Sequence, residues 1–218
     1  MKLKFLGHAG FEMVLDGKRI IVDPFITGNR ASKLRLANVG KADIVAVTHS
    51  HFDHLGDAIE IAKRDRSAFL CLTELGKTAM GGGLKDVVGL NIGGSYQIRG
   101  IEVICTQAFH TGNPGGFVFM GKERRVYHAG DTGLFGDMAL IREMYKPEVT
   151  LLPIGGYFTM GPREAAKAAE LIGAHYVVPM HYNTFDLIRQ DPKQFKDLVR
   201  ESVDASVIIL KEGETVDI

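Results

Sequence analysis

The sequence predicts an α/β protein in which two mixed β-sheets pack face to face with helices on their outer faces. Short β-prone runs joined by tight turns open the chain, and segments typical of helices alternate with apolar strands in both halves. About 45% of the 218 residues are hydrophobic, which is enough to fill a large core. No linker-like segment divides the chain, so we expect one domain over residues 1–218.

The first half of the chain is expected to supply one sheet. The runs KLKFLG, FEMVLD and RIIVD predict strands, and Asp16-Gly17 is a hairpin signal between the last two. The unbroken apolar run IVAVT, residues 44–48, predicts a strand buried on both faces. A helix is predicted over residues 55–63 and a strand at AFLCL, and the glycine-rich stretch 80–94 is predicted to be a mobile loop.

The second half is expected to begin with two hairpins, SYQIRGIEVICTQA and FVFMGKERRVYHA, with turns near Gly100 and Gly121. Helices are then predicted over residues 138–145, 162–172 and 192–201. The second of these has Pro162 in its first turn, where proline is favoured. These helices alternate with the apolar strands VTLLPI, HYVVPM and SVIIL, a pattern typical of helices packed on a sheet.

The composition of the chain indicates which partners it binds and in which cellular compartment it lies. The chain has 26 Lys and Arg against 26 Asp and Glu, so neither nucleic acid nor a membrane is expected as a partner. Cys71 and Cys105 lie in apolar runs and are predicted to be buried and unpaired. The N-terminus has no signal-like apolar stretch and no run is long enough to span a membrane, so we expect a cytoplasmic protein.

Histidines follow four of the predicted strands. His49 follows IVAVT, His110 follows EVICTQAF, His128 follows RRVY with Asp131 three residues later, and His181 follows YVVPM. Binding and catalytic side chains gather where strands of a rigid scaffold end in loops. The pattern therefore predicts that these four strand ends meet at a single site.

The densest part of this site is HSHFDH, residues 49–54, which holds His49, His51, Asp53 and His54. So many polar groups directly after a buried strand would destabilise the fold unless something compensates. Metal binding is the compensation that this composition favours. Imidazole suits zinc, iron, nickel and copper, whereas carboxylates shift the preference toward manganese or magnesium. The sequence thus predicts borderline ions such as zinc, manganese or iron.

The segment THSHFDHLGD resembles the HxHxDH signature of the metallo-β-lactamase superfamily. AFHTG, HAGDTG and PMHYNTF resemble the segments that carry the superfamily's remaining ligands, in the same order. GHAGFE, IIVDPF, YHAGDTG, LLPIGG and MGPREAA further resemble a group of small single-domain bacterial metal-dependent hydrolases near the ascorbate-phosphate lactonase branch. The resemblance covers the whole chain and implies a four-layer αββα sandwich.

The resemblance also implies two divalent metal ions, zinc first, with manganese or iron as alternatives. It assigns His49, His51 and His110 to one ion, Asp53, His54 and His181 to the other, and Asp131 to both. A hydroxide bridging the two ions would then cleave a small ester, lactone or phosphodiester, with Asp53 as the catalytic residue that orients it or accepts its proton.

Supporting roles are expected for three further residues. Asp23, at the end of RIIVD, is expected to contact a ligand, with a turn residue before Pro24 as the alternative. His8 is predicted either to touch substrate or a ligand, or to be structural. His128 is expected to support the loop that carries Asp131.

Loop residues near the last ligands leave more alternatives open. Asn183, Tyr157 and Thr184 are candidates to donate a hydrogen bond to a developing oxyanion, or to stabilise their loops. Asp57 is expected either to support the site or to cap a helix. His175 is predicted to be a surface residue.

Competing functions follow from the same motif. A nuclease or RNA-processing phosphodiesterase is one alternative, although the chain is short for the clamping domain such enzymes carry. A di-iron redox protein is another, although the related redox branch has glutamate where this chain has His51. A non-catalytic metal-binding protein is the third. The favoured partner is a small-molecule substrate, and a homo-oligomer stays open.

Overall fold

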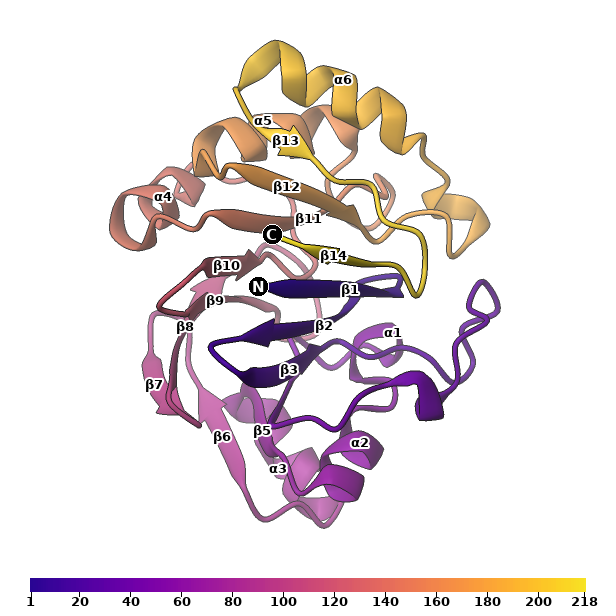
Figure 1. Cartoon of the computed structure of the whole chain (residues 1–218), viewed down its shortest axis with the longest axis vertical. Helices are drawn as coiled ribbons and strands as arrows, with labels where there is room; N and C mark the ends of the chain where they lie inside the picture. The colour runs from indigo at the N-terminus through magenta and orange to yellow at the C-terminus, as the bar shows by residue number, and fades with distance from the viewer.

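The computed structural model describes residues 1–218. The protein is built on two mixed sheets (Figure 1). The strands of the first sheet are β1 (Lys2–Gly7), β2 (Gly10–Leu15), β3 (Lys18–Val22), β4 (Ile44–Ala46), β5 (Ala68–Leu72), β6 (Val87–Leu90) and β14 (Thr215–Asp217). Those of the second are β7 (Ser95–Ile98), β8 (Ile101–Gln107), β9 (Gly115–Met120), β10 (Arg125–His128), β11 (Val149–Pro153), β12 (Tyr176–Met180) and β13 (Ser206–Val207). Both predicted hairpins of the second half are therefore confirmed.

The two sheets follow the same plan. Their strand orders are β14-β1-β2-β3-β4-β5-β6 and β13-β12-β11-β10-β9-β8-β7. In the first sheet β1, β2 and β3 are antiparallel and β3 to β6 are parallel. In the second, β7 to β10 are antiparallel and β10 to β13 are parallel. Parallel neighbours need crossover connections, and most of the helices lie in these connections.

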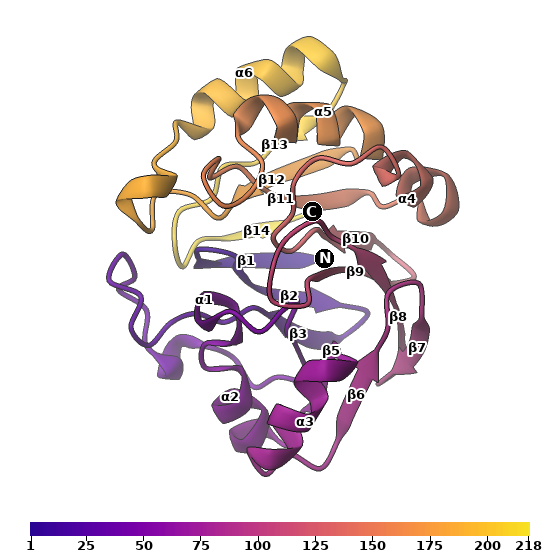
Figure 2. The same ribbon diagram turned by 180° about the vertical axis from the view of Figure 1, so that it is seen from behind.

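The helices form the two outer layers. They are α1 (Phe52–Leu55), α2 (Ala58–Asp65), α3 (Thr73–Gly81), α4 (Met138–Tyr145), α5 (Pro162–Ile172) and α6 (Pro192–Ser202), with 3-10 turns at Leu36–Asn38 and Asp186–Ile188. Figures 1 and 2 show α2 and α3 beside the first sheet and α4, α5 and α6 beside the second. Separate buried clusters join each set of helices to its own sheet. The predicted αββα sandwich is confirmed.

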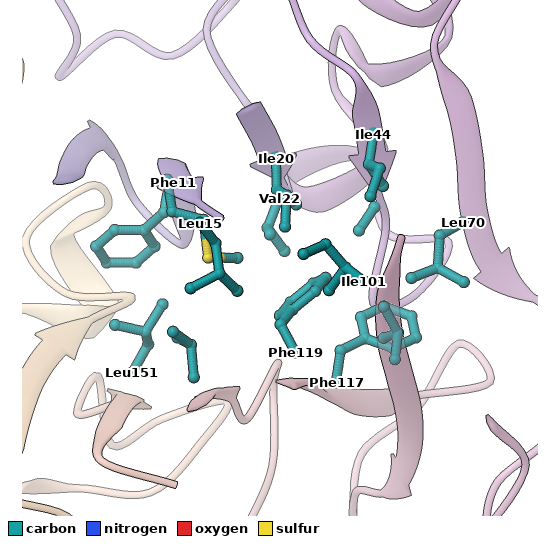
Figure 3. Close-up of a cluster of buried hydrophobic side chains, with 14 of the residues drawn as sticks. Phe11, Leu15, Ile20, Val22, Ile44, Leu70, Ile101, Phe117, Phe119 and Leu151 are labelled. Carbon is teal, nitrogen blue, oxygen red and sulfur yellow. The ribbon is translucent and has the colours of Figure 1, made fainter. Parts of the chain in front are cut away.

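The largest buried cluster lies between the two sheets. In Figure 3, Phe11 and Val22 of the first sheet lie across from Leu151 and Phe119 of the second. Strand β4 alternates between this cluster and the outer one, so it is buried on both faces as predicted. Both cysteines are buried and free. Burial of the apolar side chains in this cluster is the main contribution to the free energy that stabilises the sandwich. The packing also fixes the positions of the strand ends that carry the site.

The helix predicted over residues 55–63 is wrong in its boundaries. The chain instead forms α1 and α2, separated at Gly56. Gly56 has a φ of +37°, and a Cβ there would lie 2.4 Å from the carbonyl oxygen of Pro24. This close approach of two backbones requires glycine. It also turns α1 so that Asp53 and His54 stand apart from the amphipathic helix α2.

The loop predicted over residues 80–94 is also corrected. Within it α3 ends at Gly81, and Val87–Leu90 forms β6, which pairs in parallel with β5 at the edge of the first sheet. Pairing with a buried neighbour supplies the order that the glycines alone do not predict.

The short strand β14, which no sequence pattern indicates, pairs with β1 and brings the two termini together. None of the helices combines the length and the hydropathy that a membrane-spanning segment requires.

Candidate metal centre

All seven predicted ligands meet at one end of the sandwich, between the two sheets. His49 and His51 lie in the loop after β4, Asp53 and His54 lie on α1, His110 follows β8, Asp131 follows β10 and His181 follows β12. The structure therefore brings the strand ends of both sheets together as expected. His8, in the turn between β1 and β2, joins them.

The first ligand group consists of His49, His51 and His110. One ring nitrogen of each lies within 4.8 Å of the others. His49 Nε2 and His51 Nδ1 are 3.0 Å apart. Gly112, with a φ of +78°, lies so close that a Cβ there would be 2.9 Å from His51 Nε2. Gly112 ends the segment AFHTG, and no local pattern predicts its role, which is to leave room for the His51 ring.

The second ligand group consists of His8, Asp53, His54 and His181. Their ligand atoms also lie within 4.8 Å of one another, and three of the four side chains are almost fully buried. The His8 and His181 rings are 4.0 Å apart between centroids, and the His181 N–H donates to the His8 carbonyl at 2.7 Å. This group is therefore assembled from both sheets.

Asp131 lies between the two groups. Its Oδ2 is 3.0 Å from His181 Nε2 in the second group and 3.5 Å from His110 Nε2 in the first. Its Oδ1 is 3.3 Å from His54 Nε2. Although burial acts to raise its pKa, His54 and His181 hold the pKa of Asp131 well below its ordinary value. One buried carboxylate thus carries negative charge at the point where the two groups meet.

The hydrogen bonds of His54 indicate that a cation belongs here. His54 Nδ1 is 2.8 Å from the Asp23 carboxylate and donates to it. A neutral His54 then directs the lone pair of Nε2 at Asp131 Oδ1, and both of these buried atoms lack a hydrogen-bond partner. Either a proton or a metal ion relieves this contact. Burial lowers the pKa of His54, but Asp131 and Asp23 outweigh it and raise that pKa well above its ordinary value.

His49 is oriented in the same way. The Thr48 hydroxyl donates to Asp23 Oδ2 at 2.6 Å, so it is free to accept from His49 Nδ1 at 3.0 Å. The Nε2 lone pair of His49 then faces the first group. Burial and the neighbouring His54 lower the pKa of His49 to about 3, which keeps its imidazole neutral. The donor set therefore fits borderline divalent ions.

Asp23 links the two groups from behind. It accepts from His54 directly and from Thr48, which in turn orients His49. The Thr48 N–H also donates to Asp23 Oδ1 at 2.8 Å, and Asp23 is fully buried. This is the contact with a ligand that its place after β3 predicts, now seen to reach one histidine in each group.

His128 and Asp57 support neighbouring backbone. The Gly130 N–H donates to His128 Nδ1 at 3.1 Å, so Nε2 carries the proton and donates to the Ala9 carbonyl at 2.9 Å. His128 thus fixes the loop that carries Asp131. Asp57 accepts from the Ile26 and Thr27 N–H groups and does not cap its helix through its side chain.

His8 contacts Asp53 rather than open space. Its Nε2 donates to Asp53 Oδ2 at 3.1 Å, so its Nδ1 accepts from the Thr184 hydroxyl at 2.9 Å. Burial lowers the pKa of His8 to about 4, so it is neutral at pH 7. The sequence predicts that Thr184 is an oxyanion donor or a loop contact, whereas its hydroxyl donates to His8. No local pattern links residues 8, 53 and 184, because only the packing of the two sheets brings them together.

Three other candidates lie outside the ligand groups. The Asn183 side chain is exposed, and its Oδ1 accepts from the Gln190 N–H at 2.9 Å, which is the loop-stabilising alternative. Tyr157 is exposed and packs edge-on against Phe158. His175 is exposed, as expected of a surface residue.

Residues 18–182, which contain every predicted ligand, match the family described as "Beta-lactamase superfamily domain". A UPF0173 metal-dependent hydrolase of Caldivirga maquilingensis is 49% identical over 222 residues, covering 99% of this chain and 97% of its own length. The chain belongs to the metallo-β-lactamase superfamily. Within the superfamily it falls in the UPF0173 group of metal-dependent hydrolases, which confirms the predicted resemblance.

Solved structures of the superfamily agree with this placement. Igni18, a metallo hydrolase from the hyperthermophilic archaeon Ignicoccus hospitalis, has a TM-score of 0.93 and 40% identity, covering 99% of this chain and 97% of its own. The proteins similar to this chain therefore include an archaeal one, beyond the bacteria that the sequence motifs indicated. CmlA, a diiron β-hydroxylase from Streptomyces venezuelae, shares the fold at a TM-score of 0.80 with 16% identity, covering 100% of this chain and 54% of its own. Because hydrolases and a hydroxylase share the metallo-β-lactamase fold, the reaction must be argued from the site.

Proposed function

We propose that this protein is a dinuclear metal-dependent hydrolase of a small ester, lactone or phosphodiester. The single observation that carries the proposal is Asp131, a buried carboxylate that contacts histidines of both ligand groups. A buried carboxylate that contacts neutral imidazoles on both sides is costly unless cations balance it. His51 stands where the related redox branch has glutamate, which favours hydrolysis over the redox alternative.

Seven side chains would hold the two ions. His49, His51 and His110 would hold the first, Asp53, His54 and His181 the second, and Asp131 both. Zinc suits this donor set best, with manganese or iron as alternatives. When bound, two such ions supply an activated water at neutral pH and an electrophile for the oxygen of the scissile group.

Asp53 is the residue that we assign to proton transfer. Its carboxylate borders the cavity above the ligands and is fixed by the hydrogen bond from His8. Burial acts to raise its pKa, but His8 and His54 lower it, so Asp53 is ionised at neutral pH. It can therefore accept a proton while His8, held by Thr184, keeps the carboxylate in place.

Metal analysis combined with kinetics tests this proposal. We expect purified protein to hold about two divalent ions per chain and to hydrolyse members of an ester, lactone and phosphodiester panel. Asp53→Ala is expected to reduce turnover by about 10²- to 10⁴-fold, the usual contribution of a general acid or base. As a control, Asp137→Ala changes an exposed carboxylate outside the centre and should leave both measurements unchanged. Full turnover in Asp53→Ala would contradict the assigned role.

A further inference from the structure

A cavity of about 450 Å³ opens at the candidate metal centre. Ten residues line it, of which four are hydrophobic, and no lysine or arginine is among them. The polar residues are candidate ligands together with Thr111. The hydrophobic ones are Phe52, Phe158, Phe185 and Leu187. The volume lies within the range of small-molecule sites.

The hydrophobic side chains come from three separate segments. Phe52 is on α1, Phe158 lies in the loop between β11 and α5, and Phe185 and Leu187 lie in the loop after β12. Phe52 is 69% exposed, Leu187 59% and Phe158 48%. Large apolar side chains exposed around a polar centre mark a surface that binds a ligand. The four side chains converge from distant segments and form one side of the cavity, which we call the apolar wall.

The apolar wall adjoins the second ligand group. The Phe185 and Phe52 rings are 6.4 Å apart between centroids, and the Phe185 and His8 rings are 5.5 Å apart. His8 is the residue that donates to Asp53. A group seated against Phe185 would therefore lie next to the carboxylate that we assign to proton transfer.

The charge of the cavity distinguishes substrate classes. Nucleic acids and nucleotides carry several phosphates, which proteins bind through lysine and arginine side chains. The lining offers only carboxylates as charged side chains beside its histidines and Thr111. The cavity therefore offers no lysine or arginine to a polyanionic substrate, and bound metal ions would be its main positive charges.

We propose that the substrate is a small carboxylic ester or lactone with an uncharged alkyl or aryl group beside the scissile bond. This inference rests on the proposed function and narrows its substrate class. The apolar group contacts Phe158, Phe185 and Leu187, while the carbonyl faces the ligands. Each methylene that is fully buried against this wall tightens binding by up to about fourfold.

Calorimetry with hydroxamates tests the apolar wall independently of turnover, since a hydroxamate binds metal through its head group. Acetohydroxamate, butanohydroxamate and hexanohydroxamate would be titrated into zinc-loaded protein, together with succinic monohydroxamate as a charged analogue. We expect Kd to fall by about two- to fourfold for each added methylene. The charged analogue should bind more weakly than butanohydroxamate, which has the same number of carbons.

Matched variants locate the effect. Leu187→Ser and Phe158→Ser change exposed side chains and are expected to flatten the chain-length series while leaving the affinity for acetohydroxamate within about twofold. Leu140→Ser alters a side chain on α4 that is 53% exposed and outside the cavity, and it should preserve the full series.

The outcomes separate the two proposals. If acetohydroxamate binds but longer chains gain nothing, or if the charged analogue binds best, the apolar substrate class is overturned and the dinuclear hydrolase stands. If the protein retains no metal, both proposals fall. A chain-length series that Leu187→Ser and Phe158→Ser flatten, and Leu140→Ser does not, supports the assignment.

Discussion

The two ligand groups differ in how the fold builds them. The first group, His49, His51 and His110, comes from two loops, and two of its three rings are only half-buried. The second group, His8, Asp53, His54 and His181, comes from the β1–β2 turn, α1 and the loop after β12, and it is nearly enclosed. Each group joins part of the motif at residues 49–54 to a strand end of the second sheet, but the second group also includes His8 from the turn between β1 and β2, which no motif indicates.

The contacts that hold the candidate ligands in place also differ between the two groups. In the second group, His54 is fixed by Asp23, and Asp53 by His8 and Thr184. In the first group, the Thr111 hydroxyl is 3.4 Å from His51 Nε2, and the His51 ring depends on the space that Gly112 leaves. Asp131 contacts both groups directly, and Asp23 reaches both from behind. Substitution of Asp131 is therefore expected to disturb both groups, substitution of His8 or Thr184 only the second group, and substitution of Gly112 only the first.

Asp131→Ala is expected to have the largest effect, because it removes the carboxylate that joins the groups. We expect bound metal to fall from about two ions per chain to below one. Turnover should drop by more than about a hundredfold, beyond the range of contacts that merely support a ligand. Elemental analysis and steady-state kinetics measure both. If Asp131→Ala retained both ions, the two groups would bind independently and the comparison would need revision.

His8→Ala is expected to have an intermediate effect confined to the second group. His8 positions Asp53, so kcat should fall by about 10- to 100-fold with little change in KM or in metal content. Thr184→Val removes the hydroxyl that His8 accepts from and should cost about tenfold or less, whereas Thr184→Ser should restore activity. Loss of the second ion in His8→Ala would instead make His8 a ligand.

Gly112→Ala should produce the smallest effect, in the first group alone. Gly17→Ala is a matched control, because Gly17 has nearly the same positive φ, +75° against +78°, but nothing within 4 Å of its added Cβ. Both variants should lose about 1 kcal/mol in free energy of unfolding. Only Gly112→Ala should also weaken binding of one ion, by about tenfold, in a metal-competition titration. Equal metal affinity in both variants would show that the His51 ring tolerates the added methyl.

Local sequence determined most of the secondary structure and the composition of the site. Hairpin turns, apolar runs and proline at a helix start gave β1 to β3, α4 and α5 because each depends on neighbouring residues. The motif at residues 49–54 and the histidines after strands predicted the shared site because strand ends of a sandwich meet at its edges. Errors arose at Gly56 and in residues 80–94, where contacts with distant backbone overrode local preference.

Tertiary structure decided the partners of the ligands and the shape of the cavity. The hydrogen bond from His8 to Asp53, the path from Asp23 through Thr48 to His49, and the wall that includes Phe185 all join residues far apart in the chain. A sequence records which donors are available, since metal chemistry restricts their types. It does not record which of them face one another, because the packing of two separate sheets through one buried core sets those distances.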